Sequence, residues 1–353
     1  MSATTQFLKT LTIELPIIQA PMAGVATPEL AAAVSNAGGL GSLGLGASTV
    51  VQSRQMIEKT FALTGRPFNV NVFCHDRAQR NATEESAWIT HLAPLFMELG
   101  QTPPATLNEI YRSFLDDNDM QKLLLELRPA VVSFHFGLPS AEYLEALRQA
   151  GIYTMATATN LPEARRIEKS GINAIVAQGI EAGGHRGMFD QAANDERLST
   201  AVLVRLLVRQ TGLPIIAAGG IMDGPGIKAS LELGAAAAQL GTAFILCPES
   251  LANEAYRANL KSERAAHTRL TAALSGRPAR GLSNRLIVHG EALGSPRPAA
   301  YPLAYDAAKQ LNAAGAKLGK HEFAAHWAGQ GAPLARELPA AELMQVLAKE
   351  LHE

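Results

Sequence analysis

The chain has 353 residues, of which 47% are hydrophobic and 18% charged, and its formal net charge is −1. Such a composition can fill one large α/β domain or two ordinary ones, and the balanced charge argues against nucleic acid or a membrane surface as the main partner. No signal peptide and no apolar run of membrane-spanning length is found. Cys74 and Cys247 lie too far apart in the sequence to suggest a disulfide framework or a thiolate metal site, which favours a reducing cytoplasm.

Short apolar segments alternate with helical patterns along the chain, as in parallel βα units. Most of these segments are nearly continuous apolar runs, which is typical of strands buried on both faces. Eight strands are predicted, at residues 17–21, 41–45, 68–73, 130–136, 153–157, 174–178, 214–218 and 237–242. Eight such strands predict an α/β fold of the closed (β/α)8 type, the TIM barrel.

Helix signals fall between these strands. Thr27 before Pro28 is an N-cap followed by proline at the first helical position, and the pair Leu161-Pro162 and Asp223 open two further helices. The last segment, 340–352, has the pattern of an amphipathic helix that returns to the barrel.

Two regions break the barrel rhythm. Because both follow the carboxyl ends of strands, we expect them to lie on the catalytic face and to pack together as a smaller, mostly helical substrate-binding or lid domain. The predicted division assigns residues 1–74, 127–248 and 332–353 to the barrel, and residues 75–126 and 249–331 to the lid.

The segment Gln178-Gly-Ile-Glu-Ala-Gly-Gly-His185-Arg-Gly carries the strongest functional signal. It follows a buried strand directly, and its paired glycines let the backbone approach a ligand closely. His185 comes next and is the best candidate for a base or a substrate-orienting group.

Two further strand ends resemble a phosphate site. Gly219 and Gly220 end the seventh strand, and Gln239-Leu240-Gly241-Thr242 ends the eighth. In many barrels these two loops bind phosphate through backbone N–H groups. Ordinary turn glycines would give the same sequence pattern. A G-x-G-x-x-G match at residues 39–44 follows a helix rather than a strand, so a dinucleotide-binding interpretation fails.

Buried amides need partners. Asn69 and Asn71 share one strand face. A flavin ring edge, or a structural network between strands, would supply hydrogen-bond partners for their amides. The same two interpretations apply to Gln178. Three histidines, His75, His135 and His185, fall near strand ends and raise the possibility of a metal site, but no carboxylate accompanies them, so no metal is predicted. His135 is equally a candidate structural histidine.

Tyr301, Tyr305 and Lys309 are spaced four residues apart, which places them on one helix face. Two phenols and an ammonium could bind a small anion or form a solvated stripe. Residues 327–331 could be a closing loop or a packed turn.

Taken together, these segments resemble the class I nitronate monooxygenase family. The resemblance runs through residues 19–24, 69–75, 133–139, 178–187, 218–221, 239–242 and 327–330, so it spans nearly the whole chain in order.

The resemblance implies a barrel that holds non-covalent FMN and oxidatively denitrifies alkyl nitronates, notably propionate 3-nitronate, with O2 and without NAD(P)H or metal. It implies that His185 is catalytic, as a base or as a charge-stabilising cation. It implies substrate contacts for His135, Tyr301, Tyr305 and Lys309, and a monomer or homodimer that binds a small anionic nitronate. The implied cofactor-binding residues are Pro21, Met22, Ala23, Asn71, Gln178, Gly183, Gly220, Gln239, Leu240, Gly241, Thr242 and Gln330.

Two alternatives remain open from the sequence. An FMN-dependent NADH enoyl-thioester reductase would share the barrel and much of its glycine pattern. A non-catalytic flavin- or phosphate-binding barrel would also fit, but it would leave His185 without a purpose.

Overall fold

A sheet of eight parallel strands forms the centre of the protein. The computed structural model describes residues 2–353 and orders the strands β1-β9-β8-β6-β5-β4-β3-β2. Their bounds are β1 (Ile17–Gln19), β2 (Gly41–Gly44), β3 (Phe68–Phe73), β4 (Val131–His135), β5 (Tyr153–Ala158), β6 (Ala174–Gln178), β8 (Ile215–Ala218) and β9 (Ala237–Leu240). All eight predicted strands are present, which confirms the predicted barrel.

The sheet closes between its first and last members. Ile18 bridges to Leu40 in parallel register, the Leu40 N–H donates to the Ile17 carbonyl at 3.0 Å, and the Gln19 N–H donates to the Leu40 carbonyl at 3.0 Å. Gly41 then opens β2 with no room for a side chain, because a Cβ there would lie 1.9 Å from the Ala31 carbonyl oxygen. Closure therefore depends on close packing of the helix that carries Ala31.

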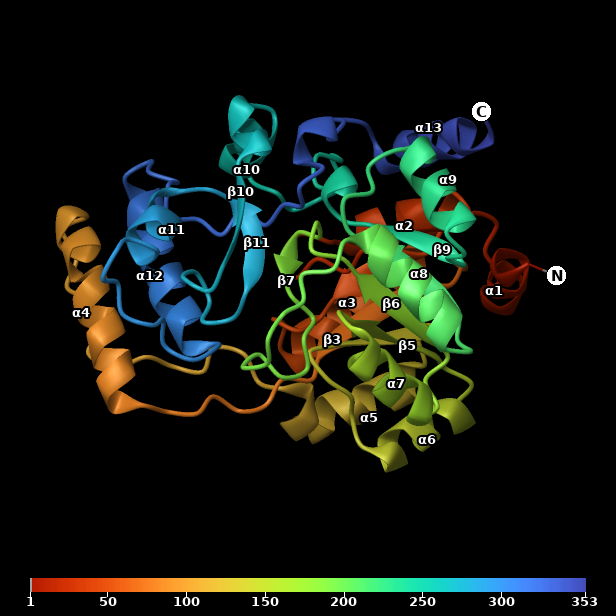
Figure 1. Ribbon diagram of the computed structural model, residues 1–353, viewed down its shortest axis with the longest axis horizontal. Coiled ribbons are helices and arrows are strands. Elements are labelled where there is room, and N and C mark those ends of the chain that lie inside the picture. Colours follow the sequence, from red (N-terminus) through yellow and green to blue (C-terminus); the bar gives the residue numbers. More distant parts are fainter. Residues whose placement is uncertain (1) are drawn as a thin grey trace.

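Eight helices alternate with the barrel strands and cover the sheet, although helices of the smaller unit come between β3 or β9 and the covering helix (Figure 1). The covering helices are α2 (Pro28–Asn36), α3 (Val50–Leu63), α5 (Asn118–Leu127), α6 (Ala141–Gln149), α7 (Leu161–Lys169), α8 (Thr200–Gln210), α9 (Gly224–Glu232) and α13 (Ala340–His352). Thr27, Asn160 and Asp223 accept the expected N-cap hydrogen bonds, so the predicted helix starts are confirmed. The N-terminal helix α1 (Ala3–Leu11) packs Phe7 and Leu11 against the apolar cluster that includes Ile18, Val131 and Val176.

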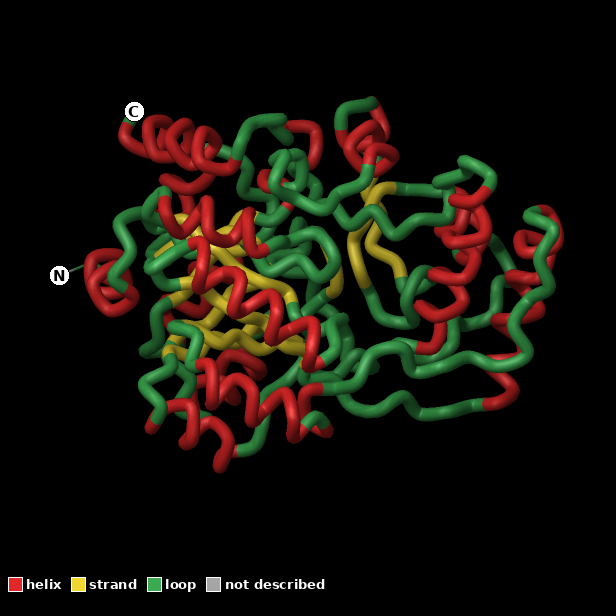
Figure 2. The backbone as a smooth tube through the Cα atoms, turned by 180° about the vertical axis from the view of Figure 1, so that it is seen from behind, coloured by secondary structure: helices red, strands yellow, loops and turns green. Residues whose placement is uncertain are grey.

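The smaller unit lies beside the barrel and away from both chain termini (Figures 1 and 2). It contains helices α4 (Ala82–Glu98), α10 (Glu254–Leu260), α11 (Arg285–Gly290) and α12 (Leu303–Lys317). Trp88 and Leu92 of α4 share one apolar cluster with Leu303 and Leu311 of α12. Segments of the two regions that interrupt the alternation of strands and helices, residues 75–126 and 249–331, therefore pack together.

The smaller unit also contains a sheet that was not predicted from the sequence. Strands β10 (Thr268–Thr271) and β11 (Ala279–Leu282) pair antiparallel, and β7 (Gly184–His185) adds to the other edge of β11. The predicted division also differs at α5, whose residues Met120, Leu123 and Leu124 belong to the apolar cluster of the barrel.

Within residues 2–353, none of the helices is long and apolar enough to cross a membrane.

Candidate functional site

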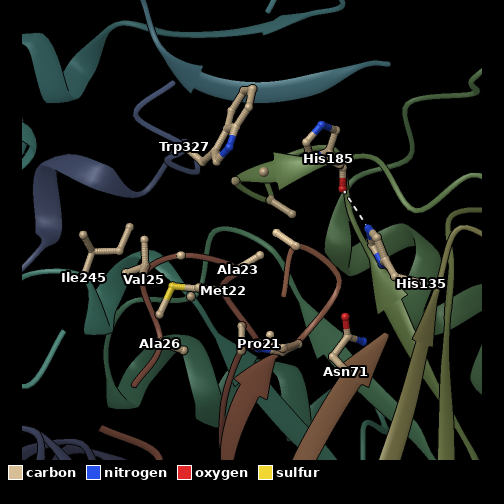
Figure 3. A pocket seen from close by; sticks show the side chains of 18 of the residues that line it. Pro21, Met22, Ala23, Val25, Ala26, Asn71, His135, His185, Ile245 and Trp327 are labelled. Atoms are coloured by element: carbon tan, nitrogen blue, oxygen red, sulfur yellow. Dashed lines mark hydrogen bonds between the residues drawn. The ribbon is translucent and has the colours of Figure 1, made fainter. Parts of the chain in front are cut away.

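A cavity of about 740 Å³ lies between the carboxyl ends of the barrel strands and the smaller unit. Figure 3 shows His185 and Trp327 on one side of it, opposite Pro21 and Asn71. The predicted site residues that line it are Pro21, Met22, Ala23, Asn71, His135, Gln178, Gly183, His185, Gly220, Gln239, Gly241, Thr242, Tyr301, Tyr305 and Lys309. Strand ends far apart in the sequence thus converge as expected.

Two predicted residues lie elsewhere. The Leu240 side chain is buried within β9, so it packs in the barrel core rather than on the cavity surface. Gln330 is exposed, and its backbone N–H donates to the Glu181 carbonyl at 2.9 Å. Neither residue is among those that line the cavity.

His185 is held through its backbone by two barrel strands. Its carbonyl oxygen accepts from Gln178 Nε2 at 2.9 Å and from His135 Nε2 at 3.2 Å, the second contact being the dashed line in Figure 3. On its other side, β7 pairs with β11, where His185 lies opposite Ala279. The imidazole is therefore fixed at the junction between the barrel and the smaller sheet.

The hydrogen bonds around Ser275 set the tautomer of His185. The Ser275 hydroxyl donates to the Arg277 carbonyl at 3.0 Å, so its single hydrogen is already used. Ser275 Oγ, 2.9 Å from His185 Nε2, must then accept from an Nε2–H. The neutral ring consequently has its lone pair on Nδ1, which has no hydrogen-bond partner among the described residues.

The surroundings of His185 oppose a positive charge. Burial, followed by the positive charge of Arg277, lowers the pKa of His185 to about 3. The imidazole is therefore neutral near pH 7 and can accept a proton at Nδ1. Of the two roles left open by the sequence, base or cation, the geometry of the free protein favours the base.

His135 acts on His185 rather than on the cavity. Because a carbonyl can only accept, His135 Nε2 donates to the His185 oxygen, and Nδ1 then accepts from the Thr157 hydroxyl at 3.0 Å. Both ring nitrogens have protein partners, and burial lowers the pKa of His135 to about 3. The reading of His135 as a satisfied structural histidine therefore fits its contacts.

The side chain of Gln178 also has protein hydrogen-bond partners. Its Oε1 accepts from the Gly187 N–H at 2.8 Å, while Arg186 Nη1 donates to the Gln178 carbonyl at 2.8 Å. Arg186 is fully buried and pairs with Asp195, Nε to Oδ2, at 2.9 Å. This network fixes the turn after β6, so Gln178 orders the chain at the cavity wall.

Asn71 presents an unpaired oxygen to the cavity. Its Nδ2 donates to the Ser133 hydroxyl at 2.8 Å and to the Ser133 carbonyl at 3.1 Å, which fixes the orientation of the amide. Oδ1 receives no hydrogen bond from the described residues and faces the cavity in Figure 3. Asn69 instead donates to the Ser42 hydroxyl at 3.1 Å and lies within the barrel.

The two predicted phosphate loops lie on one cavity wall. Gly219 and Gly220 have φ of +127° and +73°, conformations that other residues rarely adopt. A Cβ on Gly183 would lie 2.5 Å from the Gly329 nitrogen, so this approach also needs glycine. The Gly329 N–H donates to Thr242 Oγ1 at 2.9 Å, which leaves the hydroxyl hydrogen of Thr242 free to donate.

Tyr301, Tyr305 and Lys309 all reach the cavity, but they do not form one helical stripe. Helix α12 begins at Leu303, because Pro302 is its N-cap, and Tyr301 precedes it. Lys309 Nζ lies 5.4 Å from the Tyr305 ring centroid and 4.9 Å from that of Tyr111. Lys309 is exposed at the residue level, but partial removal of its ammonium from water lowers its pKa. It has no carboxylate within 4.0 Å among the described residues.

Several residues at or near the site carry no sequence signal. Tyr111 lies in the polar stretch after β3, Ser275 in a turn of the smaller unit, and Tyr256 on α10, where its hydroxyl donates to the Trp327 carbonyl. An isolated tyrosine or serine carries no pattern that predicts which segment it will meet. Their roles arise only from the packing of the smaller unit on the barrel.

No group of three or more His, Cys, Asp or Glu side chains that could hold a metal ion occurs in the described part of the chain. The three histidines near strand ends are not arranged as ligands, because His135 uses both ring nitrogens for protein contacts.

The family model described as nitronate monooxygenase matches residues 4–350. A nitronate monooxygenase of Paraburkholderia phytofirmans is 58% identical over 98% of this chain and 94% of its own length. One from Pseudomonas aeruginosa is 55% identical over 99% of each chain. The crystal structure of nitroalkane oxidase from Streptomyces ansochromogenes superposes with a TM-score of 0.90 at 42% identity, covering 99% of this chain and 98% of that one.

Buried histidines predict a pH-dependent stability. Burial holds the pKa of His135 and His185 at about 3 and that of His75 and His326 at about 4, below their ordinary value of 6.5. The unfolded chain therefore binds more protons than the folded chain between about pH 6.5 and pH 4, and stability falls as the pH falls through this window. From pH 7.5 to 5.5, we expect urea unfolding to show a loss of about 1 kcal/mol for each of these histidines.

Two neighbouring substitutions test the cause. His326→Gln should flatten the pH dependence, because that residue is buried, whereas His321→Gln should not, because His321 is exposed. Equal stability at the two pH values would contradict the explanation.

Proposed function

The chain belongs to the nitronate monooxygenase family of oxidoreductases, and we propose that it denitrifies alkyl nitronates oxidatively with O2 and non-covalent FMN. We propose propionate 3-nitronate as a substrate in particular, and neither NAD(P)H nor a metal as a requirement. The observation that carries the proposal is the neutral His185, with Nδ1 unpaired, on the wall of a cavity whose other walls suit a flavin.

The cavity fits FMN by three tests. Its volume of about 740 Å³ falls within the range of cofactor pockets. The unpaired Asn71 Oδ1 can accept from a ring N–H, and the loop of Pro21, Met22 and Ala23 offers an apolar wall. Gly220, Gly241 and Thr242 all line the cavity and follow the adjacent strands β8 and β9, where a phosphate cradle would form.

Bound FMN would supply the one-electron exchange between nitronate and O2. The chain's own residues would bind the substrate, orient it and manage its proton. A nitronate is already an anion, so it needs no base, whereas a neutral nitroalkane must first lose its α-proton. We assign that proton to His185 Nδ1.

Lys309 suits the far end of a substrate that carries a carboxylate. Its ammonium is held beside Tyr111 and Tyr305 and has no carboxylate partner among the described residues. Burial raises the pKa of Tyr301 and Tyr305, so both phenols stay protonated and can donate hydrogen bonds. Propionate 3-nitronate carries two negative groups, and this edge could bind the second.

The proposed reaction predicts a yellow protein that releases FMN on denaturation. With propionate 3-nitronate it should consume O2 and form nitrite in the absence of NADH, as followed with an oxygen electrode. NADH oxidation dependent on an enoyl thioester, without nitronate-dependent O2 uptake, would instead establish the reductase alternative. Retained flavin that no donor reduces would indicate a non-catalytic barrel.

Gly220→Ala should weaken FMN binding about tenfold or more, because its φ of +73° is strained for alanine and the new Cβ would lie 3.1 Å from the Glu181 Cβ, so the loop would have to shift. The matched control is Gly294→Ala, which also has a positive φ (+85°) but lies at an exposed position with nothing within 4 Å of the new Cβ. Fluorescence titration of the apoprotein with FMN measures both. Equal losses in the two variants would mean that backbone strain alone, and not the cradle, explains the effect.

His185→Asn should lower kcat/KM for a neutral nitroalkane by about 10²–10⁴-fold, the usual contribution of a positioned base. Turnover of the preformed nitronate should stay within about tenfold, since no proton has to be removed from it. Because the pKa of His185 is lowered to about 3, wild-type activity on the neutral substrate should not decline through protonation of this residue between pH 8 and 5. Both substrates are assayed on the same FMN-loaded preparation, and unchanged turnover of both would refute the assignment.

A further inference from the structure

Arg277 is a buried cation without an ionic partner. Its side chain is 4% exposed, and no carboxylate oxygen of the described residues lies within 4.0 Å of it. One guanidinium nitrogen donates to the Met188 carbonyl, and Nε makes no hydrogen bond at all. Leaving a buried charge unpaired is costly, so its position needs an explanation.

The guanidinium stacks on a ring that borders the cavity wall. Its Cζ lies 3.9 Å from the Phe136 ring centroid, and that ring is 5.8 Å from His185 and 5.7 Å from Tyr301. His185 and Tyr301 both line the cavity, whereas Arg277 does not. Phe136 does not line the cavity either, so its ring and the lining rings of His185 and Tyr301 separate Arg277 from the cavity. Aromatic rings screen a charge less than water would.

The backbone at Phe136 supports this arrangement. Phe136 has φ of +75°, which is unusual for a residue with a bulky side chain, and it is 1% exposed. Such a conformation persists only where the surrounding structure imposes it, and it occurs preferentially at functional sites. Its ring serves as the platform for the guanidinium.

Neighbouring acids act on Arg277 through space but do not pair with it. The carboxylate of Glu163 accepts from the Phe189 N–H at 2.9 Å and from the Thr159 N–H at 2.7 Å, and Asp76 and Asp190 act on Arg277 only through space. The remaining charged or titratable groups that act on His185 are His135 and His75, and neither is an anion. An anion in the cavity would add to the partial compensation that these acids provide.

We propose that Arg277 is a specificity-determining residue, whose buried positive charge selects an anionic group next to His185. It acts through the ring layer rather than by touching the ligand. The Arg277 carbonyl also accepts from the Ser275 hydroxyl, which in turn accepts from His185 Nε2 and so leaves the His185 lone pair on Nδ1. Arg277 thus influences both the charge near His185 and its tautomer. The inference rests on the proposed function in one respect, that the anionic group is the nitronate.

The arrangement assigns two ends to a dianionic substrate. Arg277 would favour the nitronate beside His185, and Lys309, beside Tyr111 and Tyr305, would favour the carboxylate. Arg277 is buried and Lys309 is exposed, so salt should screen the second contribution much more than the first.

Nitrite, a small monoanion that does not require turnover, is the first probe. Calorimetric titration of the FMN-loaded protein should show about tenfold weaker nitrite binding in Arg277→Met and a change of less than about threefold in Arg277→Lys, which keeps the charge. Arg280→Met is the control, because Arg280 is also buried and also has no carboxylate within 4.0 Å among the described residues. It should leave nitrite affinity within about twofold, so that loss of a buried arginine in general is separated from loss of this charge.

Steady-state kinetics provide the second test. Arg277→Met should raise KM for both ethyl nitronate and propionate 3-nitronate about tenfold, whereas Lys309→Met should raise KM only for propionate 3-nitronate. High salt should reduce the effect of Lys309→Met and preserve that of Arg277→Met. If Arg277 acts only on folding, Arg277→Met should change the free energy of unfolding but should not raise KM for the two nitronates.

NMR titration of His185 gives a readout independent of catalysis. Removal of the charge in Arg277→Met should move the titration of this imidazole to higher pH, and Arg277→Lys should largely prevent the move. Nitrite affinity and His185 titration that are both unchanged in Arg277→Met, or a wild-type protein that binds no nitrite, would overturn the inference. If nitrite binding depends on Arg277 but no nitronate is oxidised, the inference stands and the proposed function fails.

Discussion

The site depends on one backbone carbonyl. The oxygen of His185 accepts hydrogen bonds from Gln178 at the end of β6 and from His135 at the end of β4, while the same residue pairs with β11 of the smaller sheet. Two barrel strands and the smaller unit thus meet at one residue. Because both lone pairs of the oxygen are used, the imidazole has little freedom to move relative to the barrel.

This constraint explains why several polar residues near the cavity do not face a ligand. The hydrogen bonds that fix the chain around His185 use the polar groups of Gln178, His135 and Arg186. Groups on the cavity lining that keep unsatisfied capacity include the His185 Nδ1, the Asn71 Oδ1 and the Lys309 ammonium. The proposed chemistry uses these free groups, since a group that already has its partners gains little from a ligand.

Electrostatics then distinguish the two ends of the cavity. Near His185, burial and Arg277 oppose protonation, so the imidazole remains a neutral acceptor in the free protein. An anion bound there would partly offset Arg277 and would raise the proton affinity of His185 at the same time. Anion binding and proton acceptance at His185 are therefore coupled through the charge of Arg277. Lys309, on helix α12, acts separately.

The sequence by itself determined the barrel, because continuous apolar runs and capped helices are local patterns that few folds other than eight βα units can accommodate. It also placed His185, Asn71 and the glycine loops at strand ends, which parallel strands bring to one face. Only the tertiary structure decided which of these groups remain free, that β7 joins a second sheet, and that Arg277 lies behind Phe136 without a counter-charge. These features depend on contacts between segments that are far apart in the chain. Hydrogen-bond satisfaction and charge compensation are properties of such contacts rather than of any local pattern.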